Sequence, residues 1–207
     1  MNILHITCSP RGKSAESYLL SQRVLAQLLE KNPHANIISR DLWADQLPHV
    51  DGNYAAALGG MRSISGEELN TGSLGMSEQL IVELENADYV VIGTPMHNFT
   101  VPSVLKAWID HVVRIKRTFN ATAEGKFGLL ADRPVFIAAA SGGHSMGERS
   151  RHPDFLEPYL RAILATIGLH DLTFFTVQGT AFGPEPLASA KLQADDAIAE
   201  YFGKVYS

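Results

Sequence analysis

The N-terminal stretch MNILHITCSPRGKSAES contains two residue patterns that are typical of phosphate chemistry. Gly12-Lys13-Ser14 resembles the end of a nucleotide-triphosphate loop, and Cys8 follows a short apolar run as a phosphatase nucleophile would. A triphosphate loop also needs a glycine five positions before its Gly-Lys-Ser, but Thr7 stands there. A cysteine phosphatase needs an arginine to clamp the phosphoryl oxygens where this chain has Ser14. The sequence therefore argues against both of these phosphate loops.

The same stretch is still suited to holding a phosphate in a simpler way. An apolar run is followed by a loop rich in hydroxyl groups and by the predicted start of a helix, where backbone N–H groups and the positive end of the helix dipole favour anions. Ser9, Ser14 and Ser17 can then bind a phosphate monoester without a lysine or magnesium. The alternative is that Ser14 and Ser17 only cap the helix.

A second loop, residues 94–99 (TPMHNF), follows a buried apolar run. Asn98 can donate and accept hydrogen bonds, while Met96 and Phe99 offer a soft apolar wall. These properties suit a flat heteroaromatic ligand with polar edges. In the alternative interpretation, Met96 and Phe99 belong to the core.

A third loop, residues 140–144 (ASGGH), contains two adjacent glycines. Glycine removes the side chain that would keep a ligand away from backbone N–H groups, so these donors can approach the pyrimidine edge of a flavin. His144 follows the glycines and is a candidate proton donor; its alternative role is structural.

The pattern of apolar residues predicts an α/β protein in which these loops share one edge. Strands are predicted at residues 2–8, 35–40, 89–93, 134–140 and 172–177, and helices at 14–31, 76–86, 101–117, 155–167 and 185–201. Such alternation predicts a parallel sheet covered on both faces, with ligands beyond the carboxyl ends of its strands. We expect one domain over residues 1–207, with an excursion at about 42–75 that has one or two helical turns.

The amino-acid composition indicates which kinds of binding partner and which cellular compartment to expect. A formal net charge of -5 lacks the basic excess of a nucleic-acid binder. The single cysteine allows no intrachain disulfide, and no stretch reaches the ~20 apolar residues of a membrane span. We therefore expect a cytoplasmic protein with no nucleic-acid or membrane partner and no metal site.

Taken together, the three loops give the chain a resemblance to a known family. The residues that carry it are Ser9-Pro10-Arg11-Gly12 with Ser17, residues 95–99, residues 105–110 (LKAWID), Thr118-Phe119, Gly142-Gly143-His144 and Gly183-Pro184-Glu185. In this order and at this spacing, they resemble the FMN-dependent NADH azoreductases among the flavodoxin-like NAD(P)H:quinone oxidoreductases.

The resemblance implies a flavodoxin-like three-layer fold with a five-stranded parallel sheet of order 2-1-3-4-5. It also implies a homodimer with bound FMN, reduced by NADH or NADPH, which passes two electrons to quinones and cleaves azo compounds in a ping-pong reaction. The cofactor contacts implied by position are Ser9, Ala15, Glu16, Ser17, Met96, His97, Asn98, Phe99, Ala140, Ser141, Gly142 and Gly143. Phe119 and His144 are implied in the substrate pocket, although Phe119 could equally belong to the core, and no side chain is an essential catalyst.

Three positions depart from the usual pattern of the family. His97 stands where tyrosine is common, Ala15 where serine is common, and Ala140-Ser141 where Ser-Arg is common. We expect His97 to alter acceptor preference or flavin potential and Ser141 to change the pocket rim. Losing one hydroxyl at position 15 removes about 1 kcal/mol of phosphate binding, so FMN should still bind.

Two other functions compete with this interpretation. A flavodoxin-type electron carrier would have the same fold but no pocket for a small-molecule acceptor; such carriers tend to be shorter and more acidic than this chain. A hydrolase would act through Ser9 or Cys8 with a histidine, but no sequence feature assigns a base to either residue.

Overall fold

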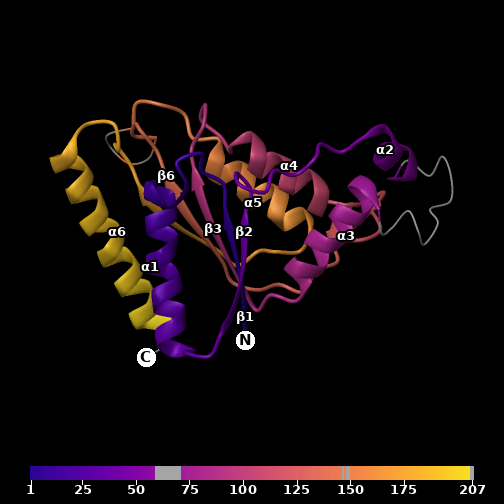
Figure 1. Ribbon diagram of the computed structural model, residues 1–207, viewed down its shortest axis with the longest axis horizontal. Coiled ribbons are helices and arrows are strands. Elements are labelled where there is room, and N and C mark those ends of the chain that lie inside the picture. The colour runs from indigo at the N-terminus through magenta and orange to yellow at the C-terminus, as the bar shows by residue number, and fades with distance from the viewer. Residues whose placement is uncertain (59–70, 146, 148–149, 206–207) are drawn as a thin grey trace.

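The computed structural model describes residues 1–58, 71–145, 147 and 150–205 (Figure 1). Its centre is a sheet of five parallel strands in the order β2-β1-β3-β6-β7. The strands are β1 Asn2–Thr7, β2 Asn36–Asp41, β3 Tyr89–Pro95, β6 Val135–Ala140 and β7 Leu172–Val177. This order confirms the predicted flavodoxin-like 2-1-3-4-5 sheet.

Strands β1, β3 and β6 are apolar on both faces because helices cover both sides of the sheet. Along β1, Leu4 and Ile6 belong to one buried cluster, whereas Ile3 belongs to the cluster on the opposite face. Because successive side chains of a strand point to opposite faces, one strand contributes to both cores. Their burial explains why the strands read as continuous apolar runs in the sequence.

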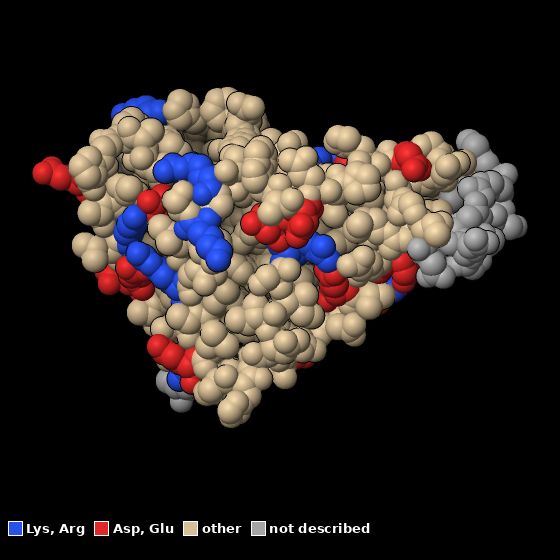
Figure 2. Space-filling view, viewed as in Figure 1, with Lys and Arg blue, Asp and Glu red and all other residues tan. Residues whose placement is uncertain are grey.

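The helices form two outer layers (Figure 1). Helices α1 Glu16–Lys31 and α6 Pro184–Val205 pack on one face of the sheet, with Leu20, Val24 and Phe202 in their shared core. Helices α3 Gly72–Glu85, α4 Ser103–Val112 and α5 Leu156–Thr166 cover the other face around Trp108. Interspersed basic and acidic side chains cover the α1 and α6 surface (Figure 2).

The predicted helix at residues 101–117 is too long, because α4 ends at Val112. The side chain of Thr118 closes this end: its hydroxyl donates to the carbonyl of Val112 at 2.6 Å and accepts the N–H of Arg114 at 2.9 Å. Lys116 has a positive φ of 63°. A side chain that competes for backbone hydrogen bonds ends the helix, although the apolar period continues to Val113.

Two short elements lie between the main ones. An antiparallel hairpin, β4 Phe119–Thr122 with β5 Gly125–Gly128, was not predicted. The excursion after β2 contains helix α2 Gly52–Leu58, which agrees with one or two helical turns; residues 59–70 of it lie outside the described part of the chain. Helix α3 begins at Gly72, earlier than the predicted residue 76. The division into a single domain stays a prediction.

In the described ranges 1–58, 71–145, 147 and 150–205, no helix has the length and apolar character needed to cross a membrane.

Candidate functional site

The three loops chosen from the sequence follow β1, β3 and β6, which are adjacent in the sheet. Strand order reverses between β1 and β3, since β2 lies beyond β1 and β6 beyond β3. Crevices at such a switch point are the usual ligand sites of open α/β sheets. The parallel direction of the strands brings all three loops to the same edge, as expected.

The loop after β1 turns through a short 3-10 helix, η1 Gly12–Ser14, into α1. The N–H of Gly12 donates to the carbonyl of Ser9 at 3.0 Å, and Gly12 itself has a φ of 54° that favours glycine. The first backbone hydrogen bond into α1 runs from Leu19 to Ala15, and no side chain caps the helix. The N–H groups of its first turn are therefore available to an anion.

The hydroxyl group of Ser17 is the unusual feature of this helix start. Ser17 is 1% exposed, and its Oγ has no hydrogen-bond partner among the residues that the structure describes. Ser9 is also buried, and its Oγ accepts only a long 3.3 Å bond from the N–H of Arg11. A buried hydroxyl without a partner is costly. A phosphate at the start of α1 would satisfy both hydroxyls, so the residues fit the phosphate of FMN.

Glu16 contributes a negative charge at the same helix start. Its carboxylate pairs with Nζ of Lys191 on α6 at 2.9 Å. This ion pair offsets a negative charge that would otherwise repel a phosphate. The backbone N–H is then the group through which Glu16 can bind the phosphate. Ala15, the adjacent N-cap residue, is buried and has the extended backbone that a cap requires.

Cys8 lies behind this loop and does not have the properties of a nucleophile. It is fully buried, and its Sγ donates to the carbonyl of Gly93 at 3.3 Å. Burial raises the pKa of its thiol to about 12, whereas a nucleophilic cysteine needs a lowered pKa. The structure therefore gives Cys8 a packing role.

Gly93 sets the distance between β3 and the start of α1. A Cβ at this position would lie 3.0 Å from the carbonyl oxygen of Ser17 and 3.0 Å from Oγ of Ser21. Only a residue without a side chain lets the helix approach the strand this closely. The position of the first-loop donors therefore depends on a glycine in the neighbouring strand.

The loop after β3 is a tight turn with strained residues. His97 and Thr100 exchange two backbone hydrogen bonds of 2.9 and 3.0 Å. The two residues between them, Asn98 and Phe99, have φ values of 49° and 70°. Asparagine tolerates this region, but an aromatic residue there carries strain of the kind found at binding sites. The turn leaves the ring of Phe99 substantially exposed.

The loop after β6 joins this turn to form a cavity of about 240 Å³, which we call the loop cavity. Hydrogen bonding between the N–H of Met96 and the carbonyl of Ala140 at 2.8 Å holds the two loops together. The loop cavity is lined by Met96, Asn98, Phe99, Ser141, Gly142, Gly143, Ser145 and His152. Six of these residues were predicted cofactor contacts. The first loop does not line this cavity but lies at the same sheet edge.

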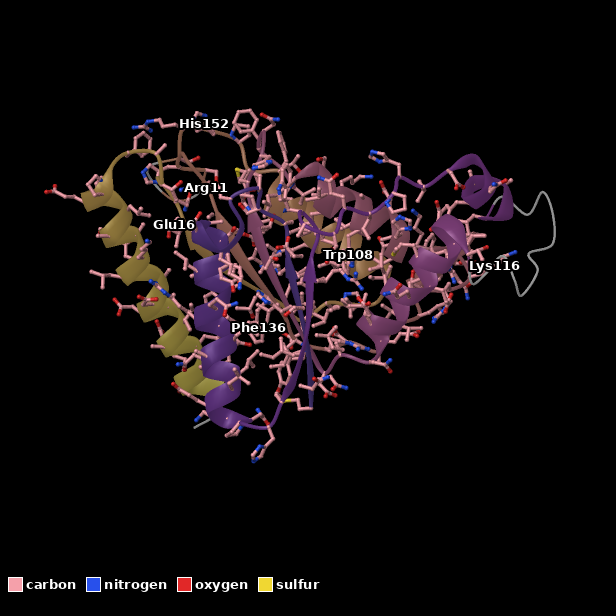
Figure 3. All side chains as sticks on the ribbon, viewed as in Figure 1. Arg11, Glu16, Trp108, Lys116, Phe136 and His152 are labelled. Carbon is pink, nitrogen blue, oxygen red and sulfur yellow. The ribbon has the colours of Figure 1, made fainter. Side chains whose placement is uncertain are left out.

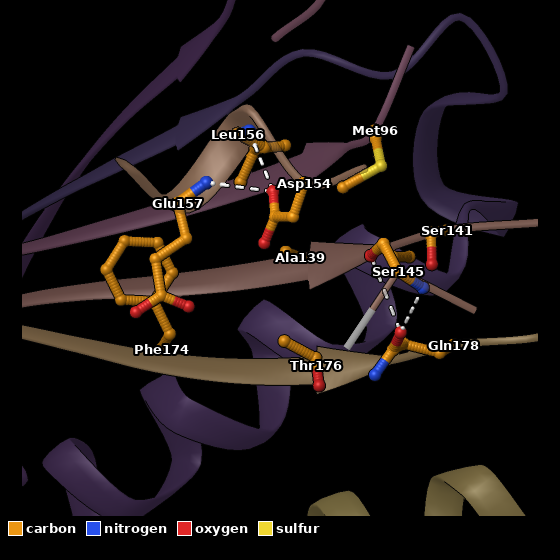
Figure 4. Close-up of a pocket in the computed structure, with 11 residues that line it drawn as sticks. Met96, Ala139, Ser141, Ser145, Asp154, Leu156, Glu157, Phe174, Thr176 and Gln178 are labelled. Atoms are coloured by element: carbon orange, nitrogen blue, oxygen red, sulfur yellow. Dashed lines mark hydrogen bonds between the residues drawn. The ribbon is translucent and has the colours of Figure 1, made fainter. Parts of the chain in front are cut away.

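A second pocket, drawn in Figure 4, shares Met96, Ser141 and Ser145 with the loop cavity. Ala140, another predicted contact, lines this pocket. Two hydrogen bonds fix its ends: the N–H of Ser145 donates to Oε1 of Gln178 at 2.8 Å, and Oδ1 of Asp154 accepts the N–H of Leu156 at 2.8 Å. Oδ1 of Asp154 also accepts the N–H of Glu157 at 3.2 Å, so this carboxylate oxygen satisfies two N–H groups at the start of α5.

His144 and Phe119 lie away from the loop cavity. The His144 ring stacks on Phe182 with centroids 5.4 Å apart, close against Gly179, and it lines a separate hollow beside β7. Phe119 is buried in the hairpin, where its carbonyl accepts the N–H of Lys116 at 2.7 Å. Figure 3 places Lys116 and His152 far apart in the molecule. The predicted substrate roles of His144 and Phe119 stay predictions.

Sequence reasoning missed Ser145 and His152 as lining residues. Ser145 directly follows the predicted loop and could have been included with it. His152 reaches the cavity through the segment before α5, whose residue Phe155 donates its N–H to the carbonyl of Phe99 at 2.9 Å. No local sequence pattern predicts such a contact, because it joins segments that are far apart in the chain.

The parallel sheet and the uncapped helix start at its switch point define a flavodoxin-like α/β protein. Residues 1–202 match the family described as having a flavodoxin-like fold. An azoreductase from Bacillus anthracis superposes with a TM-score of 0.84, covering 99% of both chains. Its sequence identity is 23%, so this likeness concerns the fold alone.

Two curated relatives are much more similar in sequence. FMN-dependent NADH:quinone oxidoreductase 4 of Pseudomonas fluorescens is 45% identical over 197 residues, 95% of this chain and 93% of that protein. FMN-dependent NADH:quinone oxidoreductase 5 of Burkholderia lata is 46% identical over 180 residues, 87% of this chain and 86% of that protein. The chain belongs to this family of flavodoxin-like FMN-dependent NADH:quinone oxidoreductases, which confirms the resemblance found in the sequence.

Proposed function

We propose that this protein binds FMN and uses NADH to reduce quinones, with reductive cleavage of azo compounds as a second activity. The observation that carries the proposal is the buried hydroxyl of Ser17 at the uncapped start of α1, which has no partner in the described part of the chain. This helix start lies at the same sheet edge as a cavity of about 240 Å³. The first feature suits a phosphate and the second suits a flat ring.

In this proposal, the first loop holds the FMN phosphate through Ser9, Ser17 and the first-turn N–H groups of α1. Met96, Asn98 and Phe99 line one side of the ring, and residues 140–143 meet its pyrimidine edge. When bound, FMN supplies the redox chemistry by accepting a hydride from NADH and passing two electrons to the acceptor. Backbone N–H groups near Gly142 and Gly143 would stabilise negative charge on the ring.

The competing function is a flavodoxin-type electron carrier. Such a protein passes single electrons to a partner and needs no space for a second substrate beside the cofactor. The sequence similarity to two NADH:quinone oxidoreductases, at 45% and 46% identity, favours the enzyme.

We further propose that the protein works as a homodimer in the cytoplasm. Four large apolar side chains are exposed on segments outside the main sheet: Trp43, Val50, Phe127 and Leu129. Trp43 and Val50 lie in the segment after β2, which meets the end of α4 where Nε2 of His111 donates to the carbonyl of Pro48. Phe127 and Leu129 lie in or next to the β4–β5 hairpin, which meets it where the N–H of Phe119 donates to the carbonyl of Arg114. Exposed apolar side chains of this size suit burial against a second copy.

The function is tested by purifying the protein and identifying any flavin that it carries. NADH oxidation is then measured with benzoquinone and with an azo dye, before and after adding FMN. We expect one FMN per chain and steady NADH oxidation with either acceptor. A protein that binds no FMN contradicts the proposal, and one that binds FMN but reduces neither acceptor supports the electron carrier.

A further inference from the structure

His152 occupies a position in the loop cavity that the family motifs do not assign. Its segment is tied to two of the three loops: the N–H of Arg151 donates to the carbonyl of His144 at 2.9 Å, and the N–H of Phe155 to that of Phe99 at 2.9 Å. Between these anchors, the hydroxyl of Ser150 donates to the carbonyl of His152 at 3.2 Å. The segment therefore bridges the second and third loops and holds His152 between them.

The imidazole ring of His152 lies between Phe99 and Gly143. It stacks on the ring of Phe99 with centroids 5.7 Å apart and planes inclined by 30°. On its other side, a Cβ at Gly143 would lie 2.8 Å from Cδ2 and 3.1 Å from Nε2 of His152. The absence of a side chain at Gly143 therefore makes room for this ring. Phe99, whose strained backbone presents its ring outward, supplies the opposite wall.

The other polar groups of the cavity are engaged elsewhere or lack an ionisable side chain. The Ser141 hydroxyl donates to the carbonyl of Gly143 at 2.8 Å, and Ser145 bonds to Gln178. His144, the candidate from the sequence, lines a different hollow. Of the described residues that line the loop cavity, His152 alone has an ionisable side chain. With the amide of Asn98, its ring N–H is a side-chain hydrogen-bond donor that the cavity offers to a second ligand.

We propose that His152 is an acceptor-binding residue: its ring N–H donates a hydrogen bond to the carbonyl oxygen of a quinone, or to an azo nitrogen, of an acceptor that binds beside the FMN ring at the loop cavity. The hydrogen bond strengthens as negative charge builds on the acceptor atom during electron transfer. The inference rests on the proposed function and assigns a substrate contact within it.

The test compares His152→Phe, which keeps an aromatic ring but removes the donor, with His152→Gln, which keeps a donor. His34→Phe is the matched control, because His34 is exposed and lies in the turn before β2. For each variant, FMN affinity is measured by flavin fluorescence, and reduction by NADH is followed separately from reoxidation by benzoquinone. Ferricyanide serves as an acceptor that accepts electrons without such a hydrogen bond.

We expect His152→Phe to slow reoxidation by benzoquinone about tenfold to a hundredfold, the range for a hydrogen bond to a developing charge. FMN affinity, reduction by NADH and reoxidation by ferricyanide should stay near the wild-type values, and His152→Gln should recover most of the benzoquinone rate. Wild-type benzoquinone kinetics in His152→Phe would overturn the inference.

An equal loss with benzoquinone and ferricyanide, or a loss of FMN binding, would also overturn it by assigning His152 to the cofactor or the loop structure. Failure of the proposed function itself looks different, since the wild-type protein would then bind no FMN or fail to oxidise NADH.

Discussion

At the scale of single residues, the site is marked by polar groups that the fold leaves unsatisfied. Ser17 is buried, and no described residue bonds to its hydroxyl. Neighbouring Ser21 shows that this helix can satisfy a hydroxyl, because its Oγ donates to the carbonyl of Tyr18 at 2.7 Å and lies 2.9 Å from Nε2 of His5. The difference between the two serines is position, since Ser17 lies in the uncapped first turn. The FMN phosphate proposed at this helix start would account for its hydroxyl.

Replacing Ser17 with alanine tests this account directly. We expect Ser17→Ala to weaken FMN binding about fivefold to tenfold, equivalent to a hydrogen bond of about 1 kcal/mol or slightly more. Riboflavin, which has the same ring and no phosphate, should bind both proteins equally. Flavin fluorescence titration measures both affinities. An equal loss for riboflavin would assign Ser17 to the ring or to folding.

His5 should make stability depend on pH. Burial lowers the pKa of this histidine from 6.5 to about 4, with Asp41 opposing the shift. Between those values, the unfolded chain binds a proton that the folded protein does not, so the free energy of unfolding falls as pH decreases through this window. The loss should be about 2 kcal/mol between pH 7.5 and pH 5.

The pH effect is measured by urea unfolding of the flavin-free protein at these two pH values. His5→Gln removes the titrating group and should lose most of this pH dependence, while His34→Gln, at an exposed position, should keep it. The same pH dependence in His5→Gln would contradict a lowered pKa for His5.

At the scale of elements, the site depends on how closely α1 packs against β3. Gly93 permits this approach, and the loop between β3 and α4 then brings its turn to the same edge. The helix face that packs there contains Leu20 and Val24, while its first turn is left without a side-chain cap. Packing therefore fixes the helix, and its free N–H groups are positioned as a consequence.

Gly93→Ala should disturb both stability and flavin binding. Its Cβ would press on the backbone of Ser17, and overpacking of this kind costs about 1–3 kcal/mol. The same displacement should weaken FMN binding, which can be measured alongside urea unfolding. Gly203→Ala is the matched control: a Cβ there meets no atom within 4 Å, and alanine favours a helix. Wild-type stability in Gly93→Ala would show that the strand and helix can separate freely.

At the scale of the whole molecule, the two helical layers differ in their surfaces. The α1 and α6 side carries exposed ion pairs such as Arg23 with Asp195, whereas exposed Trp43 and Phe127 belong to segments next to the end of α4. Burying such charges against a second copy would require removing them from water, which is costly. The proposed second copy is therefore expected on the α4 side.

The dimer is tested by sedimentation velocity over a range of protein concentrations. We expect the wild-type protein to sediment as a particle with twice the mass of one chain. Trp43→Lys with Phe127→Lys should shift it toward the monomer, because burying a charge at an apolar interface is costly. Leu192→Lys, on the exposed side of α6, should leave the dimer intact. A wild-type monomer at all concentrations would contradict the proposed assembly.

The order of elements followed from the sequence because its signals are local. Continuous apolar runs at β1, β3 and β6 reflect burial on both faces, and β7 matches the predicted strand at both ends. The position of all three loops at the carboxyl ends of these strands followed from the parallel topology alone. The end of α4 did not, since Thr118 overrides an apolar period that continues beyond Val112.

What only the tertiary structure decided is which side chains meet at that edge. His144 has the better sequence context, but its ring packs on Phe182 and Gly179, while His152 lies in the loop cavity against Phe99. The sequence by itself determined the sheet, the three loops and the family. It could not determine these contacts, because they depend on backbone hydrogen bonds and close approaches between distant segments, which leave no periodic pattern in the chain.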